Sequence, residues 1–143
     1  MAKPTEITVK AWGRLLRAYG TASSTVERAL KDADFPPLSW YDVLLELERS
    51  GKDGMRPFEL QDELLLPQYG ISRLLNRIGT AGYIERHSCE NDGRGQRLII
   101  TQTGKKIRRR MWSVYSEAIE QAVGSKLTPK EAETLCRLLK ALV

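Results

Sequence analysis

The stretch from residue 68 to residue 104 constrains the fold of this chain most, because its apolar periodicity changes from helical to extended part-way along. Apolar residues recur at three- and four-residue steps in its first part, at Ile71, Leu74, Leu75 and Ile78. This spacing predicts an amphipathic helix, and Gly79 and Gly82 predict its end. The opposite face carries polar or aromatic side chains, at Tyr69, Ser72, Arg73, Asn76 and Arg77.

Two short segments after this helix predict a β-hairpin. Residues 83–87 (YIERH) are expected to form one strand and residues 97–101 (RLIIT) its partner. The segment between them, CENDGRGQ, is rich in turn residues and carries Arg94 at its centre. A helix with a polar face followed by a hairpin with an arginine at its tip has the layout of a winged helix-turn-helix. In that layout the helix enters the major groove of DNA and the wing tip reaches the minor groove.

The basic residues of the chain gather in the same region. Residues 69–113 hold ten Lys or Arg and three Asp or Glu, a net charge of +7. The remaining residues hold thirteen basic and fifteen acidic residues, a net charge of −2, so this region supplies the whole excess of +5. A local basic patch on an otherwise nearly neutral chain indicates a site for a polyanion. The alternative is a solvated basic face that binds nothing.

Further helices are predicted on both sides of the central stretch. Apolar spacing predicts helices over residues 7–31 and 40–50 before it, and from about residue 105 to about residue 123 after it. Ser39 is expected to be the N-cap of the second of these helices, with Asp42 three residues further on.

Proline positions predict the layout immediately before the central helix. Pro57 suits a first helical turn and opens a short helix over residues 57–66, which Pro67 closes. A turn of three or four residues would then join this helix to the central one, which is the spacing of a helix-turn-helix. The last helix is predicted to start at a capping box formed by Thr128, Pro129 and Glu131.

These elements predict a mainly α fold. The length, residues 1–143, suits one domain with a sizeable core. We expect a winged helix-turn-helix lobe over residues 38–101, with terminal helices in residues 1–34 and 105–143 forming a dimerisation bundle. The alternative is that the terminal helices cap the core of their own chain. The dimer is favoured because a two-fold symmetric protein suits a palindromic DNA site.

Several classes of protein fit the sequence poorly. It has no apolar run long enough for a membrane span and no signal-peptide pattern, so a cytoplasmic protein is expected. Cys89 and Cys136 lie far apart and predict no disulfide framework. With His87 as its single histidine, and no phosphate loop or metal-ligand spacing, the chain is not expected to be an enzyme or to hold a cofactor or metal.

Four stretches together carry a resemblance to a known family: LSWYDVLLEL, LLLPQYGISRLLNRIGTAGYIER, DGRGQRLIITQTG and LTPKEAETLCRLLKAL. They resemble the MarR (multiple-antibiotic-resistance regulator) family of bacterial transcription factors over essentially the whole chain. The wing signature, an Asp-x-Arg followed by a strand end resembling Leu-Thr-x-x-Gly, is the most specific part. The resemblance implies a homodimeric winged-helix repressor or activator. Such proteins bind a short palindrome near their own promoter, and often release it when a small molecule binds or a cysteine is oxidised.

Within this family layout, different turns of the recognition helix are expected to do different work. Direct contact with bases is expected from its N-terminal turns, at Gln68, Tyr69, Ser72 and Arg73. Phosphate contacts are expected one turn further on, at Asn76 and Arg77. Two alternatives stay open: Arg77 as a surface salt bridge, and Tyr69 as an aromatic packed at the helix start. Gly70 stands where many members carry a hydroxyl residue, which shifts the expected sequence preference toward Gln68 and Tyr69.

The wing is expected to supply the remaining DNA contacts. Arg94 suits a narrow A·T minor groove, and Asp92 is expected either to hold its guanidinium or simply to serve the turn. Arg86 and Arg97 flank the wing and are expected to bind the DNA backbone. Three residues that follow are expected either to add non-specific phosphate contacts or to form a solvated helix face: Lys105, Lys106 and Arg108.

The least constrained expectation is an effector site. A pocket for a small aromatic or lipophilic effector is predicted from the aromatic and Met residues Trp12, Tyr19, Trp40, Met111, Trp112 and Tyr115. The alternative is that each packs in a core. Cys89 lies beside basic residues that favour its thiolate, although an idle thiol is the preferred interpretation, and Cys136 is expected in a core. The rival function is a winged-helix module that binds RNA or a protein partner.

Overall fold

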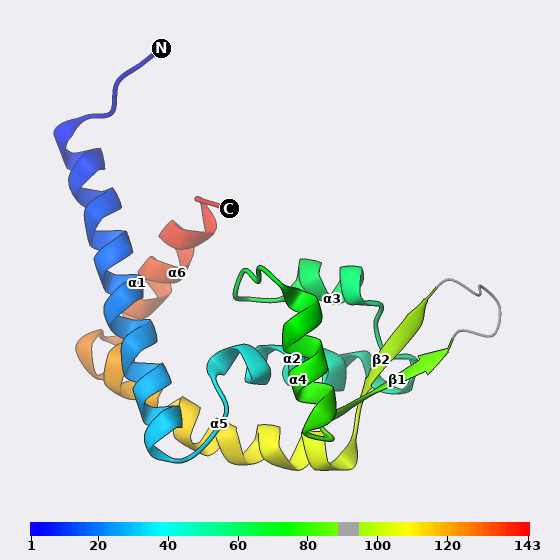
Figure 1. Ribbon diagram of the computed structural model, residues 1–143. Helices are drawn as coiled ribbons and strands as arrows, with labels where there is room; N and C mark the ends of the chain where they lie inside the picture. Colours follow the sequence, from blue (N-terminus) through cyan, green and yellow to red (C-terminus); the bar gives the residue numbers. More distant parts are fainter. Residues whose placement is uncertain (89–94) are drawn as a thin grey trace. The chain divides into compact units, whose positions relative to one another are not determined.

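The computed structural model describes residues 1–88 and 95–143 of the chain and divides into two compact units. One unit, here called the winged lobe, comprises Asp34–Ser113. The other, here called the terminal unit, comprises Met1–Ala33 together with Val114–Val143. The described residues form six α-helices and one two-stranded antiparallel sheet (Figure 1), which confirms the mainly α fold class. None of the helices in this part of the chain combines the length and apolar character that a membrane crossing needs.

The winged lobe begins with three helices, α2 (Leu38–Ser50), α3 (Pro57–Glu63) and α4 (Ile71–Thr80). The apolar stripe predicted for α4 lies against the lobe core as its spacing required, with Leu74, Leu75 and Ile78 buried. Helix α2 contributes most to this core, because Val43, Leu44 and Leu47 are fully buried.

The predicted start of α2 is wrong. Pro37 occupies the N-cap position, and Ser39 lies inside the first turn of the helix. Pro37 has extended backbone angles and its φ is restricted by the ring, so the helix can begin directly after it. Asp42 does not assist a cap; its side chain is buried and makes contacts elsewhere in the lobe.

The link between α3 and α4 is longer than predicted. Helix α3 ends at Glu63, and residues 64–70 connect it to α4, so the predicted helical end at residue 66 and the three- or four-residue turn are both wrong. Pro67 explains part of the difference, because the residue before a proline is disfavoured in helical conformation and the helix ends upstream of it.

The hairpin consists of β1 (Ile84–Ser88) and β2 (Gln96–Ile100), paired antiparallel with Ile84 opposite Ile100. Both strands match the predicted ones to within one residue. Met55 extends the pairing on the other side of β2, through two backbone hydrogen bonds with Leu98 of 2.7 and 3.0 Å. Gly54 lies so close to the Leu98 carbonyl that a side chain would collide with it, which explains a glycine there.

Helix α5 (Gln102–Ala122) starts in the winged lobe and ends in the terminal unit. The terminal unit also contains α1 (Glu6–Asp32) and α6 (Pro129–Lys140). The predicted capping box of α6 is confirmed: Glu131 N–H donates to Thr128 Oγ1 (3.2 Å) and Thr128 N–H donates to Glu131 Oε1 (2.9 Å).

The apolar face of α6 does not lie in a core of the single chain. Leu135, Leu138, Leu139 and Leu142 are exposed, and so is Cys136. The expectation that Cys136 lies in a core is therefore wrong for the single chain, because a stripe of helical period marks an apolar face without supplying the surface that covers it.

Candidate nucleic-acid interface

The surface of α4 opposite its buried stripe is polar and open to solvent. Ser72, Arg73, Asn76 and Arg77 are all exposed, and Tyr69, just before the helix, is 99% exposed. Gln68 is half-buried. The amphipathic period of α4 thus presents Ser72, Arg73, Asn76 and Arg77 on one accessible face, whereas Gln68 and Tyr69 precede the helix and Gln68 is only partly accessible.

The start of α4 has an unusual cap. Gly70 is the N-cap residue and adopts the left-handed conformation (φ 74°), with no hydrogen bond from a capping side chain. Its carbonyl accepts hydrogen bonds from the backbone N–H groups of Arg73 (3.1 Å) and Leu74 (3.3 Å). Any other residue would be strained at this φ, so the backbone conformation explains the glycine. The glycine also leaves the start of the helix without a polar side chain at this position.

Asn76 and Arg86 form one connected pair. Arg86 Nη2 donates a hydrogen bond to Asn76 Oδ1 at 3.0 Å, which links β1 to α4. Both residues are exposed. The side-chain amide of Asn76 keeps its NH2 group as a donor, and the guanidinium of Arg86 has more donors than this bond uses. The pair can therefore place several N–H donors side by side, which is the arrangement that a phosphate oxygen requires.

Arg97 on β2 faces the lobe as well as solvent. Its Nη1 lies 3.3 Å from the carbonyl oxygen of Asp53 and 3.4 Å from that of Gly54, to both of which it donates. These bonds hold the base of the wing against the turn after α2. The sequence predicted a backbone-contact residue here, and the structure adds this bracing role.

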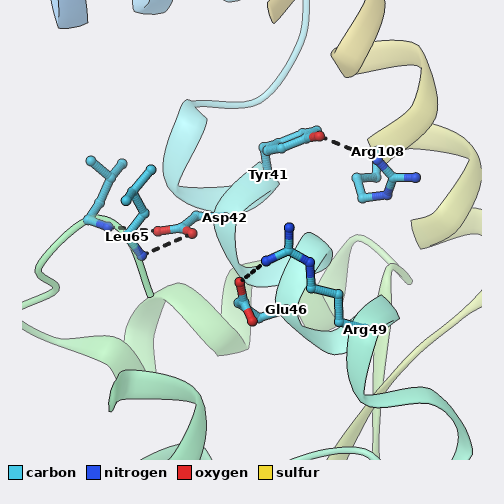
Figure 2. A network of polar contacts seen from close by, with 7 residues as sticks. Tyr41, Asp42, Glu46, Arg49, Leu65 and Arg108 are labelled. Carbon is cyan, nitrogen blue, oxygen red and sulfur yellow. Dashed lines mark hydrogen bonds and ion pairs between the residues drawn. The ribbon is translucent and has the colours of Figure 1, made fainter. Parts of the chain in front are cut away.

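Arg108 is wrongly predicted as a phosphate contact or a solvated residue. It is half-buried within the winged lobe, where its Nε forms an ion pair with Glu48. Its Nη1 donates to the Tyr41 hydroxyl at 3.3 Å (Figure 2), and its guanidinium lies 5.9 Å from the centre of the Tyr41 ring. The sequence could not show this, because the partners lie on α2, far away along the chain. Lys106 is exposed and Lys105 half-buried, so both remain candidates for non-specific phosphate contacts.

Sequence reasoning missed the carboxylate that holds the connection to α4. Asp42 is only 6% exposed, and its two oxygens accept hydrogen bonds from the backbone N–H groups of Leu65 (3.1 Å) and Leu66 (2.8 Å). Figure 2 shows the side chain pointing from α2 toward this connection. The available signal was a single acid inside the apolar run WYDVLL, since an acid on a buried face requires polar partners.

The residues predicted to line an effector pocket have different environments. In the winged lobe, Met111 is fully buried, Trp40 packs edge-on against Tyr83 (6.0 Å between ring centres), and Trp112 stacks on Tyr41 (6.2 Å). In the terminal unit, Trp12 and Tyr19 are each 60% exposed on α1, and Tyr115 is half-buried. Two surface hollows of the terminal unit are lined by other residues, one by residues of α1 and one by residues of α6 together with Leu127 before it. The effector pocket stays a prediction.

The predicted wing tip lies outside the described residues. This applies to the minor-groove arginine Arg94, its expected partner Asp92, and the thiol of Cys89. His87, the single histidine of the sequence, lies on the exposed surface of β1, where its Nε2 is 3.1 Å from Glu85 Oε2. Within residues 1–88 and 95–143, no three His, Cys, Asp or Glu side chains gather in a way that could hold a metal ion.

The sequence is similar to a known family and to curated proteins of that family. A family model described as "MarR family" matches residues 33–95. The multiple antibiotic resistance protein MarR of Escherichia coli (strain K12) is 30% identical over 87 residues, which cover 61% of this chain and 60% of that protein. Its counterpart from Salmonella typhimurium is 31% identical with the same coverage. The match therefore spans about three-fifths of the length of these curated relatives.

Similar solved structures cover almost the whole chain. Sco3205, a MarR family transcriptional regulator from Streptomyces coelicolor crystallised in complex with DNA, superimposes with a TM-score of 0.89 at 25% identity, covering 99% of this chain and 89% of that one. AbsC, a MarR family transcriptional regulator from the same organism, gives a TM-score of 0.85 over 99% of this chain and 95% of that one. Its identity is 22%, so this second likeness supports the fold alone.

Proposed function

We propose, from its match to the MarR family, that this chain is a homodimeric transcriptional regulator that binds a palindromic site in duplex DNA. The observation that carries the proposal is the exposed polar face of α4 opposite a buried apolar stripe, within a region of net charge +7. A helix of this kind can enter the major groove while surrounding arginines and lysines contact phosphates.

The proposed division of work follows the position of each side chain. Arg73 and Ser72, in the first turn of α4, are exposed and suited to base edges, together with Gln68 and Tyr69 before the helix. Asn76 and Arg77 lie one turn further along α4, and Arg86 on β1 is hydrogen-bonded to Asn76; these three residues are suited to phosphates. We also assign the wing contacts predicted for Arg94 and Asp92 to this interface, on the family resemblance.

The exposed apolar faces of the terminal unit support a homodimer. α1 and α6 carry large apolar side chains that the single chain leaves open to solvent. A second copy would cover such surfaces, and an isologous dimer would place two α4 helices about one turn of DNA apart, roughly 10 bp. Repression, and release of DNA by a small aromatic or lipophilic effector, are further proposals that rest on the family resemblance.

Selection of duplex DNA from a random pool tests the proposal, with purified protein at about 150 mM salt, where screening is physiological. Enrichment of a palindrome is the expected result. Arg73→Ala should weaken operator binding by roughly 1–3 kcal/mol and relax the preference at one base position in each half-site. Arg77→Ala should instead weaken operator and unrelated duplexes alike and reduce the salt slope by about 1.

Arg49→Ala is the matched control, because it removes the same charge from an exposed residue of α2 that pairs with Glu46. It should leave the selected sequence unchanged. A pool without enrichment, or an Arg73→Ala variant that selects the same palindrome with the same affinity, would contradict the placement of α4 on DNA. In the first case the polar face would be tested against structured RNA and protein partners.

A further inference from the structure

Asp42 is an internal carboxylate that the proposed DNA contacts do not use. It lies on α2, 6% exposed, and both of its oxygens accept backbone hydrogen bonds from residues more than twenty positions away. A buried carboxylate is costly unless it is fully hydrogen-bonded, and bonds from N–H groups to a charged acceptor are stronger than neutral ones. The two bonds therefore anchor the backbone of Leu65 and Leu66 firmly to α2.

The anchored segment leads directly into the turn that is proposed to read bases. Leu66 is followed by Pro67, which has no N–H to donate, and then by Gln68 and Tyr69. Leu65 is 76% exposed and Tyr69 is 99% exposed, so their side chains pack little against the lobe. Gly70 then starts α4 without a side-chain cap. Leu66 and Gln68 are only half-buried, so side-chain packing holds this connection in part. The Asp42 bonds add fixation of the backbone that no capping side chain provides here.

The helix that carries Asp42 is itself braced. The neighbouring residue, Tyr41, is buried and accepts a hydrogen bond from Arg108 of α5 (Figure 2). Arg108 also forms an ion pair with Glu48 on α2. Tyr41 and Asp42 therefore make their contacts with two different segments of the lobe from adjacent positions. This bracing makes α2 a fixed support against which the connection of residues 64–70 is held.

We propose that Asp42 is a positioning residue for DNA recognition. By holding Leu65 and Leu66, it sets the place of residues 68–73 relative to the rest of the winged lobe, and so determines sequence discrimination without touching DNA. This inference rests on the proposed function. Loss of the clamp releases the base-reading turn, whereas phosphate contacts from Arg77 and Arg86 persist, so operator binding falls while non-specific binding remains.

The test compares Asp42→Ala and Asp42→Asn with the wild-type chain. The alanine variant removes both acceptors, and the asparagine variant keeps one carbonyl oxygen but places an NH2 group where the second acceptor stood. The control is Glu46→Gln, one turn further along α2, where the carboxylate pairs with Arg49 at 2.9 Å. Affinities for the selected operator and for a scrambled duplex are measured at a temperature at which circular dichroism shows each variant to be folded.

The expected result is a fall in the operator-to-scrambled affinity ratio of about tenfold or more for Asp42→Ala, the factor that loss of one or two charged hydrogen bonds represents. Asp42→Asn should give a smaller fall and Glu46→Gln none. Amide hydrogen exchange at Leu65 and Leu66 should accelerate in both Asp42 variants, which shows that the clamp was released. If Asp42→Ala does not fold, Asp42→Asn with its exchange rates carries the test.

An unchanged affinity ratio with accelerated exchange at Leu65 and Leu66 would overturn the proposal, because the clamp would then stabilise the connection without influencing recognition. Unchanged exchange would overturn it too, since the bonds would not hold the segment. A wild-type chain that prefers no duplex over any other would overturn the proposed function, and this inference with it. That failure is recognisable because it appears before any variant is made.

Discussion

The winged lobe and the terminal unit bury their apolar residues to very different degrees. In the lobe, side chains from three helices and the sheet are fully buried, for example Leu47, Leu60, Leu75 and Leu98. In the terminal unit, α1 and α6 expose large apolar residues along much of their length; Leu138 of α6 is 52% exposed, and Leu142, just after this helix, is 66% exposed. The comparison teaches that one unit completes its core within a single chain, whereas the other has apolar surface left over.

The difference in burial arises because the helices of the lobe are covered by neighbouring elements on more sides than the helices of the terminal unit. In the lobe, α2 has contacts with α3, with the turn after it and with β2, so its apolar side chains are covered on several sides. The helices of the terminal unit each have one apolar stripe, and a stripe without a facing surface remains in contact with water. We therefore expect the lobe to depend on its own packing and the terminal unit to depend on protein concentration.

The largest expected effect is the loss of a core side chain in the winged lobe. Leu75→Ala removes a buried residue of α4 and should lower the free energy of unfolding by about 2–5 kcal/mol, through lost apolar burial and the cavity left behind. Urea unfolding at several protein concentrations provides the measurement, and the loss should be the same at each. A loss below about 1 kcal/mol would show that the lobe core is less complete than the burial of Leu75 indicates.

A charge on α6 should disrupt self-association. Leu138→Asp places a carboxylate on the exposed apolar face, and should raise the dimer dissociation constant at least about tenfold, because a charge is costly to bury at an interface. Sedimentation equilibrium gives this constant. Ser125→Asp adds the same charge at an exposed position before α6 and should leave association unchanged. A wild-type chain that stays monomeric at all concentrations would refute the contrast between the two units.

Helix capping should matter at α6 and not at the sequence-predicted cap of α2. Thr128→Ala removes the side-chain acceptor for Glu131 N–H and should cost about 1 kcal/mol of stability. Ser39→Ala should change stability by no more than about 0.5 kcal/mol, because Ser39 lies inside the first turn of α2. Thermal unfolding of both variants is the measurement, and equal losses would mean that Ser39 does serve as a cap.

The smallest expected effect is a pH dependence confined to the α6 cap. Hydrogen bonds from the backbone and side chain of Thr128 hold the pKa of Glu131 below its ordinary value of 4.5. The pKa of Glu131 is lower in the folded chain than in the unfolded chain. The Glu131 carboxylate therefore contributes to stability above pH 4.5, and this contribution is lost as pH falls through the folded pKa. Glu131→Gln should flatten the pH dependence of urea unfolding in this acidic window.

Glu133→Gln, on the same helix, is the control for this pH dependence because it leaves the capping box intact. The contribution is small because Glu131 is fully exposed. Identical acid profiles for the wild-type chain and Glu131→Gln would show that the capping box of α6 does not form in solution.

Local patterns predicted the elements that depend on neighbouring residues. The apolar stripe of α4 and the capping box of α6 involve residues within one or two turns of each other, so their spacing along the chain determines their geometry. The hairpin is equally local, since its two strands are adjacent in sequence. The candidate DNA-contact residues of α4 were predicted for the same reason: a buried stripe determines which face of the helix is exposed.

Contacts between distant residues explain the wrong predictions. The proline at residue 37, not Ser39, precedes α2, and Asp42 instead binds Leu65 and Leu66, 23 and 24 positions further on. The sequence predicts Arg108 as a phosphate contact or a solvated residue, yet it forms an ion pair with Glu48 and donates a hydrogen bond to Tyr41, both on α2. A buried polar group needs a hydrogen-bond partner, and the fold can supply that partner from a distant part of the chain. Spacing along the sequence does not predict which residue this will be.

By itself, the sequence determined the helical and strand periodicity, the concentration of positive charge in residues 69–113 and the polar face of α4. These properties depend on residue type and short-range spacing, which the chain carries whether folded or not. Only the tertiary structure decided which polar side chains became internal anchors and which apolar stripes remained uncovered. Both depend on the surface that lies opposite a residue after folding, and that surface comes from distant parts of the chain.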